Sequence, residues 1–222
     1  MAPERDRIYG RNPVREAQRG RRRVHRVWTS GETSADELTR LAGSPDHQGI
    51  VAEVDPYPYA DPGTLLAVEG SFVVALDQVQ DPRNLGAICR TAEAAGAAGA
   101  VICDRRAAAV TAAACKASAG AVEHLPVARV RNLTDWIETA KAAGAWVYGA
   151  DGESPTSFRT LDYEGRVVIV LGGEGGGIRP RVAGACDELV SIPSVGRVGS
   201  LNVSAAAAVL LLAVAEAHSE AD

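Results

Sequence analysis

The chain has 222 residues, of which 46% are hydrophobic and 23% are charged, and its net charge is −5. This length allows one ordinary globular domain plus a small one. Because Glu216 interrupts the C-terminal apolar stretch, we expect no membrane-spanning helix. The charged residues 1–7 predict no secretory signal, and together these features favour a cytoplasmic protein with no membrane partner.

The cysteines of the sequence contain no C-x-x-C pair. Each lies in an apolar stretch, as is typical of a reduced structural thiol. We therefore expect neither a disulfide nor a metal site. The four residues are Cys89, Cys103, Cys115 and Cys186.

Basic residues concentrate at one end of the chain, although the net charge is negative. Residues 1–30 contain nine arginines and only three acidic residues, whereas the remainder is acidic. A basic end on an acidic body is expected of an RNA-contacting module. An arginine-rich tail that only increases solubility would have the same composition.

Residues 1–54 predict a small α/β domain. Its first helix is expected to begin at Asn12 as the N-cap, with Pro13 at the first helical position. Three prolines and little periodicity predict a linker at residues 55–70. The expected elements of the small domain are a strand at 8–10, a helix from 12, a strand at 24–29, a helix at 35–41 and a strand at 49–54.

Residues 71–222 predict a larger α/β domain, because apolar strands alternate with helical patterns. This alternation indicates a mainly parallel sheet with helices on both faces. The expected strands are 72–76, 100–103, 125–130, 146–150, 167–171 and 188–192. The expected helices are 85–95, 107–118, 133–143 and an alanine-rich helix that ends near 218.

Two polar residues of the first helix in this domain are candidates for chemistry. Asn84 ends the polar loop that follows strand 72–76, and Arg90 lies about 200° around the helix from Ile88, away from the apolar stripe. Ligands of open parallel sheets bind beyond the carboxyl ends of the strands. His124 directly precedes a strand, so we interpret it as a structural or RNA-edge residue rather than a catalyst.

A glycine-rich segment follows the apolar strand 167–171. Residues 172–177 read G-G-E-G-G-G, and these glycines permit a sharp turn and close approach to a ligand. The spacing matches neither the dinucleotide-binding G-x-G-x-x-G nor a P-loop. Further on, Ser200, Asn202 and Ser204 lie at the mouth of the last helix, where they can cap it or hold a ligand.

Three segments resemble, in the same order, the motifs of the SpoU-type RNA 2′-O-ribose methyltransferases of the SPOUT superfamily. The first is D-P-R-N-L-G-A-I-C-R-T-A at residues 81–92, and the second is V-L-G-G-E-G-G-G-I at residues 170–178. The third is S-I-P at residues 191–193 followed by G-S-L-N-V-S-A-A at residues 199–206. The resemblance extends from residue 77 to residue 208.

The resemblance implies a C-terminal trefoil knot and a homodimer. The apolar run at residues 205–212 fits a helix buried against a partner, although burial within one chain gives the same pattern. It also implies S-adenosylmethionine (AdoMet) as methyl donor and RNA as acceptor. The residues that match the family's adenosyl pocket are Gly172, Gly173, Ile192 and Leu201.

The resemblance places catalysis on the motif residues Asn84, Arg90, Glu174, Ser200 and Asn202. We expect Arg90 to bind an RNA phosphate and orient the ribose, because an arginine is a poor base. Glu174 would orient Arg90 or a backbone amide. The N-terminal domain resembles that of the 23S ribosomal RNA branch, so ribosomal RNA is favoured. A transfer RNA methyltransferase and a non-catalytic RNA-binding or assembly factor remain alternatives.

Overall fold

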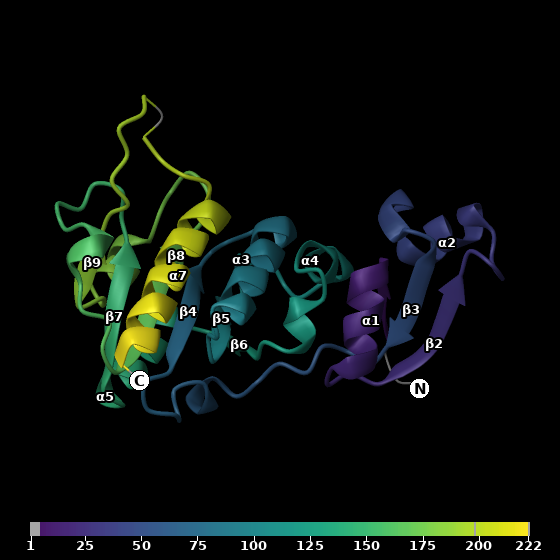
Figure 1. Cartoon of the computed structure of the whole chain (residues 1–222), viewed down its shortest axis with the longest axis horizontal. Coiled ribbons are helices and arrows are strands. Elements are labelled where there is room, and N and C mark those ends of the chain that lie inside the picture. Colours follow the sequence, from purple (N-terminus) through teal and green to yellow (C-terminus); the bar gives the residue numbers. More distant parts are fainter. Residues whose placement is uncertain (1–4, 198, 222) are drawn as a thin grey trace.

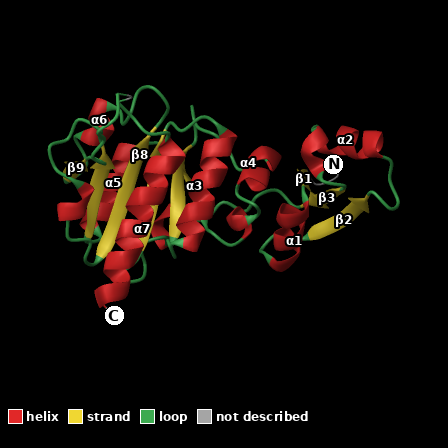
Figure 2. Ribbon diagram, turned by 45° about the horizontal axis from the view of Figure 1, so that its top comes forward, coloured by secondary structure: helices red, strands yellow, loops and turns green. Residues whose placement is uncertain are grey.

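The computed structural model describes residues 5–197 and 199–221. Figures 1 and 2 show a small sheet at one end of an elongated molecule and a large sheet at the other. The small sheet is antiparallel, with the strand order β1-β3-β2. Its elements are β1 (Asp6–Tyr9), α1 (Arg11–Arg19), β2 (Val24–Thr29), α2 (Ala35–Ala42) and β3 (Ile50–Val54).

Helix α1 begins at Arg11, two residues after the end of β1, and Gly10 is its N-cap. The prediction that Asn12 caps this helix is therefore wrong. Gly10 has a φ of 98°, a conformation that favours glycine and turns the chain into the helix early. The side-chain oxygen of Gln48 accepts a hydrogen bond from the Arg11 amide at 3.1 Å, which satisfies one donor of the first turn.

The large sheet confirms the predicted α/β architecture, and each of its strand pairs is parallel. The strand order is β6-β5-β4-β8-β7-β9. Its strands are β4 (Phe72–Asp77), β5 (Gly99–Cys103), β6 (Val127–Val130), β7 (Ala145–Ala150), β8 (Arg166–Gly172) and β9 (Glu188–Val190). Its helices are α3 (Pro82–Ala94), α4 (Ala112–Ala117), α5 (Leu133–Ala142), α6 (Pro180–Ala183) and α7 (Val203–Ala221).

Helices cover both faces of the large sheet, as the alternating pattern predicted. On one face α3 and α7 lie side by side (Figure 1) and bury Ile88 and Leu210 against the strands. On the other face α5 and α6 bury Ile137 and Val182. Among the described residues, no helix is long and apolar enough to cross a membrane. The trefoil knot stays a prediction.

Helix α4 is shorter than the predicted helix 107–118, because it begins only at Ala112. The preceding residues use their backbone groups elsewhere: the Ala108 amide donates to the Val79 carbonyl at 2.8 Å. The Val110 amide donates to the hydroxyl of Tyr59 at 3.0 Å. Alanine content alone suggested helix here, but these tertiary hydrogen bonds determine the conformation.

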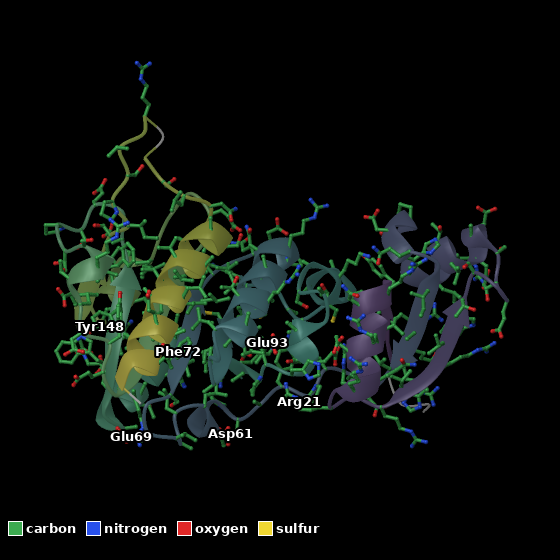
Figure 3. All side chains as sticks on the ribbon, viewed as in Figure 1. Arg21, Asp61, Glu69, Phe72, Glu93 and Tyr148 are labelled. Carbon is green, nitrogen blue, oxygen red and sulfur yellow. The ribbon has the colours of Figure 1, made fainter. Side chains whose placement is uncertain are left out.

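Residues 55–70 are packed against the large domain. Leu65 and Leu66 are buried in the core that lies under α5. The hydroxyl of Tyr57 donates to the carbonyl of Val122 at 2.8 Å and lies 3.2 Å from that of Leu125. The labelled Asp61 and Glu69 mark the path of this segment in Figure 3.

Tyr57→Phe is expected to lower the free energy of unfolding by about 1–2 kcal/mol, because it removes the hydroxyl that donates to the buried Val122 carbonyl. Urea denaturation of the variant and the wild type measures the change. A difference below about 0.5 kcal/mol, typical of a surface substitution, would show that this segment is not held by the tyrosine hydroxyl.

A buried ion pair joins the small domain to the large one. Arg22 and Glu123 have side chains that are each only 1% exposed, and Arg22 Nε lies 3.0 Å from Glu123 Oε2. Arg21, labelled in Figure 3, donates to the Leu125 carbonyl at 2.8 Å. His124 Nε2 lies 3.1 Å from Glu16 Oε2, which supports its structural interpretation. Hydrogen bonds and a buried ion pair therefore hold the two domains together.

The four cysteines are free. Burial raises the pKa of the Cys89 thiol to about 12 and that of Cys115 to about 11. Both thiols are therefore protonated at neutral pH and pack as small apolar side chains, as the sequence predicted.

Candidate active site

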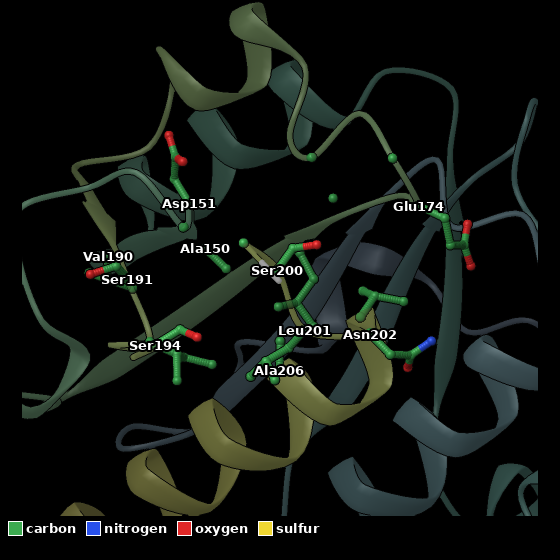
Figure 4. Close-up of a pocket in the computed structure, with 18 of the residues that line it drawn as sticks. Ala150, Asp151, Glu174, Val190, Ser191, Ser194, Ser200, Leu201, Asn202 and Ala206 are labelled. Carbon is green, nitrogen blue, oxygen red and sulfur yellow. The ribbon is translucent and has the colours of Figure 1, made fainter. Parts of the chain in front are cut away.

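A cavity of about 640 Å³ lies at the carboxyl ends of β7 and β8 and beside the segment from β9 to α7. This volume is within the range of about 300–1,000 Å³ that is usual for small-molecule sites. Figure 4 shows Ser200 and Leu201 in the middle of the cavity, with Asp151 and Ser194 on one side and Glu174 on the other. Parallel sheets commonly bind ligands at this edge.

The glycine-rich loop at residues 172–177 forms one wall of the cavity. A Cβ atom on Gly172 would lie 1.9 Å from the carbonyl carbon of Gly177, and one on Gly173 would lie 2.4 Å from the carbonyl oxygen of Gln78. Gly173 and Gly177 also form a β-bridge. At Gly172 and Gly173 the protein's own backbone therefore occupies the space that a side chain would need. This close backbone packing fixes the shape of the wall facing the cavity.

Two residues that sequence reasoning missed hold the base of this loop. Asp77, at the end of β4, is 1% exposed and receives hydrogen bonds from the Arg179 backbone amide and Nε, both at 2.8 Å. Hydrogen bonding to Asp77 raises the pKa of Arg179. Two features of the sequence could have indicated this contact: Asp77 is an acidic residue at the end of an apolar strand, and Arg179 follows the glycine-rich segment.

A chain of hydrogen bonds connects residues from all three motifs beside the cavity. Asn84, in the first turn of α3, donates its amide hydrogen to Glu174 Oε1. Its carbonyl oxygen accepts a hydrogen bond from Asn202 Nδ2 at 3.2 Å, and Asn202 Oδ1 accepts bonds from the Ser204 amide and hydroxyl at 2.9 and 2.6 Å. Asn202 directly precedes α7 and Ser204 is its second residue, so the network is attached to the start of this helix.

Arg90 lies on α3 but is not part of this network. Its side chain is exposed, and among the described residues it has neither an ion pair nor a hydrogen-bond partner. Glu174 contacts Asn84 and not Arg90, so the expected orientation of Arg90 by Glu174 is not seen. The guanidinium group is consequently available to a ligand from outside.

Asn84→Ala is expected to lower the rate of the reaction at this cavity, methyl transfer if the resemblance holds, by about tenfold, because the wall at Glu174 and the start of α7 lose their connection. A suitable control is Asn132→Ala, since Asn132 caps α5 by accepting a hydrogen bond from the Thr134 amide at 3.1 Å. The control should lose about 1 kcal/mol of stability and keep its transfer rate. Single-turnover kinetics and thermal unfolding measure both quantities. Equal rates in both variants would contradict a role for the network.

The cavity suits AdoMet by its chemistry. Ile192 is half-buried and Leu201 is 50% exposed, and both line the cavity, where they offer apolar faces to an adenine ring. The predicted residues Gly172, Gly173, Glu174, Ser200 and Asn202 line it too. Backbone groups of the loops can bind the edge of the base. Seven of the nine predicted site residues thus line the cavity, and Asn84 is joined to two of them, Glu174 and Asn202, by hydrogen bonds. Arg90 lies on α3 outside the cavity lining.

Comparisons with known proteins agree with this geometry. The model of the SpoU rRNA Methylase family matches residues 71–212. A relative assigned to the TrmH family of tRNA/rRNA methyltransferases, YacO of Bacillus subtilis (strain 168), is 37% identical over 240 residues. The match covers 96% of each chain.

Solved structures of AdoMet-bound methyltransferases are similar to the whole chain. An AdoMet-bound rRNA methyltransferase from Sinorhizobium meliloti has a TM-score of 0.85 at 26% identity, covering 96% of this chain and 87% of that one. The SpoU methyltransferase AviRb from Streptomyces viridochromogenes, in complex with AdoMet, has a TM-score of 0.79 at 26% identity, covering 95% and 89%. The chain belongs to the SpoU rRNA methylase family and is an AdoMet-dependent RNA methyltransferase.

Proposed function

We propose that this methyltransferase modifies the ribose 2′-hydroxyl of RNA, and that its substrate is 23S ribosomal RNA. The observation that carries the proposal is the hydrogen-bonded connection of Asn84, Glu174 and Asn202 at the rim of the cavity. It brings the donor cavity next to α3, whose exposed Arg90 can engage the RNA backbone.

The cavity residues bind and orient the donor. Gly172 and Gly173 shape the wall, and Ile192 and Leu201 contact the adenosyl group. When bound, AdoMet supplies a methyl group attached to a positively charged sulfur. Asn84 and Asn202 keep α3 and the start of α7 at a fixed separation, so that a hydroxyl held over α3 approaches the cavity in one direction.

Arg90 positions the acceptor. A guanidinium group binds phosphate with two parallel hydrogen bonds and remains charged at all physiological pH values. Held next to the reacting ribose, its charge also stabilises the negative charge that develops on the 2′-oxygen as the hydroxyl proton passes to water. Ser200, in the middle of the cavity, completes the polar surroundings.

The N-terminal domain supports RNA as partner and favours ribosomal RNA. Besides its arginine content, it presents the exposed residues Arg7 and Arg26, with their guanidinium carbons 6.0 and 4.8 Å from the centre of the Trp28 ring. Such basic and aromatic groups suit a nucleic-acid backbone and bases. The similar S. meliloti protein, which is described as an rRNA methyltransferase, supports the same substrate class.

We also propose that the enzyme acts as a homodimer in the cytoplasm. Leu212 on α7 is 53% exposed, and Ala205 and Ala208 on the same helix are at least partly exposed. A helix face of this composition is suited to contact a second copy. Sedimentation velocity of the wild type and Leu212→Glu tests this: we expect the wild type as a dimer and the variant as a monomer.

The substrate is tested by transfer of labelled methyl from AdoMet to unmodified ribosomal RNA and transfer RNA in parallel. We expect label in 23S ribosomal RNA. Label confined to transfer RNA would replace the proposed substrate. No label in either RNA, with an active control enzyme in the same assay, would favour a binding or assembly factor.

A further inference from the structure

We infer that Asp77 and Arg179 are positioning residues for AdoMet binding, because they fix the glycine-rich loop that forms the cavity wall. The inference rests on the proposed donor cavity. Neither residue lines the cavity, so their effect must be transmitted through the loop at residues 172–177.

Asp77 is placed to hold both ends of the loop. In the sheet it lies directly beside Gly172, where the loop leaves β8. Its two oxygens bind Arg179, which follows the loop. Oδ2 accepts a hydrogen bond from the Arg179 backbone amide, and Oδ1 accepts one from Arg179 Nε, both at 2.8 Å. The side chain of Asp77 is fully buried, so these bonds replace the water that the carboxylate would otherwise bind.

The next residue along the chain, Gln78, adds a second contact with the loop. Its carbonyl oxygen would be 2.4 Å from a Cβ atom on Gly173, so the two backbones are closely packed. Gln78 has a φ of 61°, an uncommon value for a residue other than glycine. The end of β4 thus packs directly against the backbone of the loop.

The loop in turn carries Glu174, which accepts the hydrogen bond from Asn84. A change at Asp77 would displace both the donor wall and the contact with α3. Removing the positive charge of Arg179 would leave the buried Asp77 carboxylate without its partner, which is strongly destabilising. The loop then has to move, and this movement alters the cavity.

The contact geometry predicts which substitutions are tolerated. Both side-chain contacts of Arg179, from Nε at 2.8 Å and from a terminal nitrogen at 2.6 Å, reach the same oxygen of Asp77. One ammonium group can occupy that position, so lysine should replace arginine here although it cannot replace a bidentate arginine. Methionine offers similar length without charge.

The test compares Arg179→Met, Arg179→Lys and the control Arg166→Met. Arg166 is the first residue of β8, at the end away from the glycine-rich loop, and pairs with Glu69 at 2.7 Å, so the control removes an ion-paired arginine that is remote from the loop. Isothermal calorimetry measures the AdoMet dissociation constant, and hydrogen exchange measures protection of residues 172–179 without AdoMet. Arg179 is 47% exposed, which favours folding of its variants.

We expect Arg179→Met to raise the dissociation constant by about tenfold or more and to accelerate exchange in residues 172–179. Arg179→Lys should stay within about threefold of the wild type, and Arg166→Met within about twofold. Unchanged binding and exchange in Arg179→Met, or an equal loss in Arg166→Met, would overturn the inference.

Two further results are distinguished by the same measurements. If Arg179→Met does not fold, Arg179→Gln replaces it with the same two outcomes. If the wild type itself does not bind AdoMet, the proposed function fails, and the exchange data still decide whether Asp77 and Arg179 hold the loop.

Discussion

Gly172→Ala is expected to abolish measurable AdoMet binding and to lower the free energy of unfolding by about 3 kcal/mol, the upper end of overpacking effects. The added methyl group would lie 1.9 Å from the backbone of Gly177, and backbone atoms cannot rotate away as a side chain can. The loop would have to open where it forms the donor wall. Calorimetry and urea denaturation measure the two effects.

Gly176→Ala provides a control within the same loop. A Cβ atom on Gly176 would have no neighbour within 4 Å, and its φ lies outside the left-handed region. Gly176 is also exposed and does not line the cavity. The control should bind AdoMet as the wild type does. Normal binding by Gly172→Ala, or equal losses in both variants, would contradict the role given to the backbone of the loop.

Arg90→Ala is expected to lower the catalytic rate constant by about 100-fold or more while AdoMet binds with unchanged affinity. The reason is that the proposed role of Arg90 is to stabilise charge at the acceptor, and Arg90 lies outside the donor cavity. Single-turnover transfer to saturating RNA measures the rate, and calorimetry measures donor affinity.

Arg83→Ala is the matched control, because Arg83 is another exposed arginine of α3. It removes the same charge from the same helix and should affect at most the KM for RNA. A wild-type rate in Arg90→Ala at saturating RNA would remove Arg90 from the catalytic machinery. Similar rate losses in both variants would indicate general electrostatic attraction of RNA.

The architecture of the large domain was predictable because its signal is local. Apolar strands such as 167–171 alternate with helical patterns, and parallel pairing follows from the connections. The errors occurred where distant groups determine the backbone. Val110 donates its amide to Tyr59, so that amide is not bonded to the carbonyl four residues before it, as the predicted helix 107–118 requires.

The resemblance assigned residues to a site, but it gave no set of contacts between them. It named Asn84, Glu174 and Asn202, and hydrogen bonds connect these three side chains. The sequence could not show that Glu174 binds Asn84 instead of Arg90. Nor could it show the contact of Asp77 with Arg179, since these residues are separated by 102 positions and only the parallel register brings them together.

For the N-terminal domain too, the sequence indicated a role but not the contacts. Its basic composition indicated an RNA partner, but composition carries no information about where the domain is attached. The buried pair of Arg22 and Glu123 and the docking of Tyr57 show a firm connection to the large domain. A bound RNA would therefore meet the basic surface and α3 in a fixed relation.

The most direct test of the account is the position of the transferred methyl group on the nucleotide. RNA methylated with labelled AdoMet is hydrolysed in alkali, which cleaves only beside a free 2′-hydroxyl. Methylation of the ribose oxygen predicts that the label is recovered in an alkali-resistant dinucleotide. Label recovered in mononucleotides would show methylation of a base and would contradict the proposed reaction.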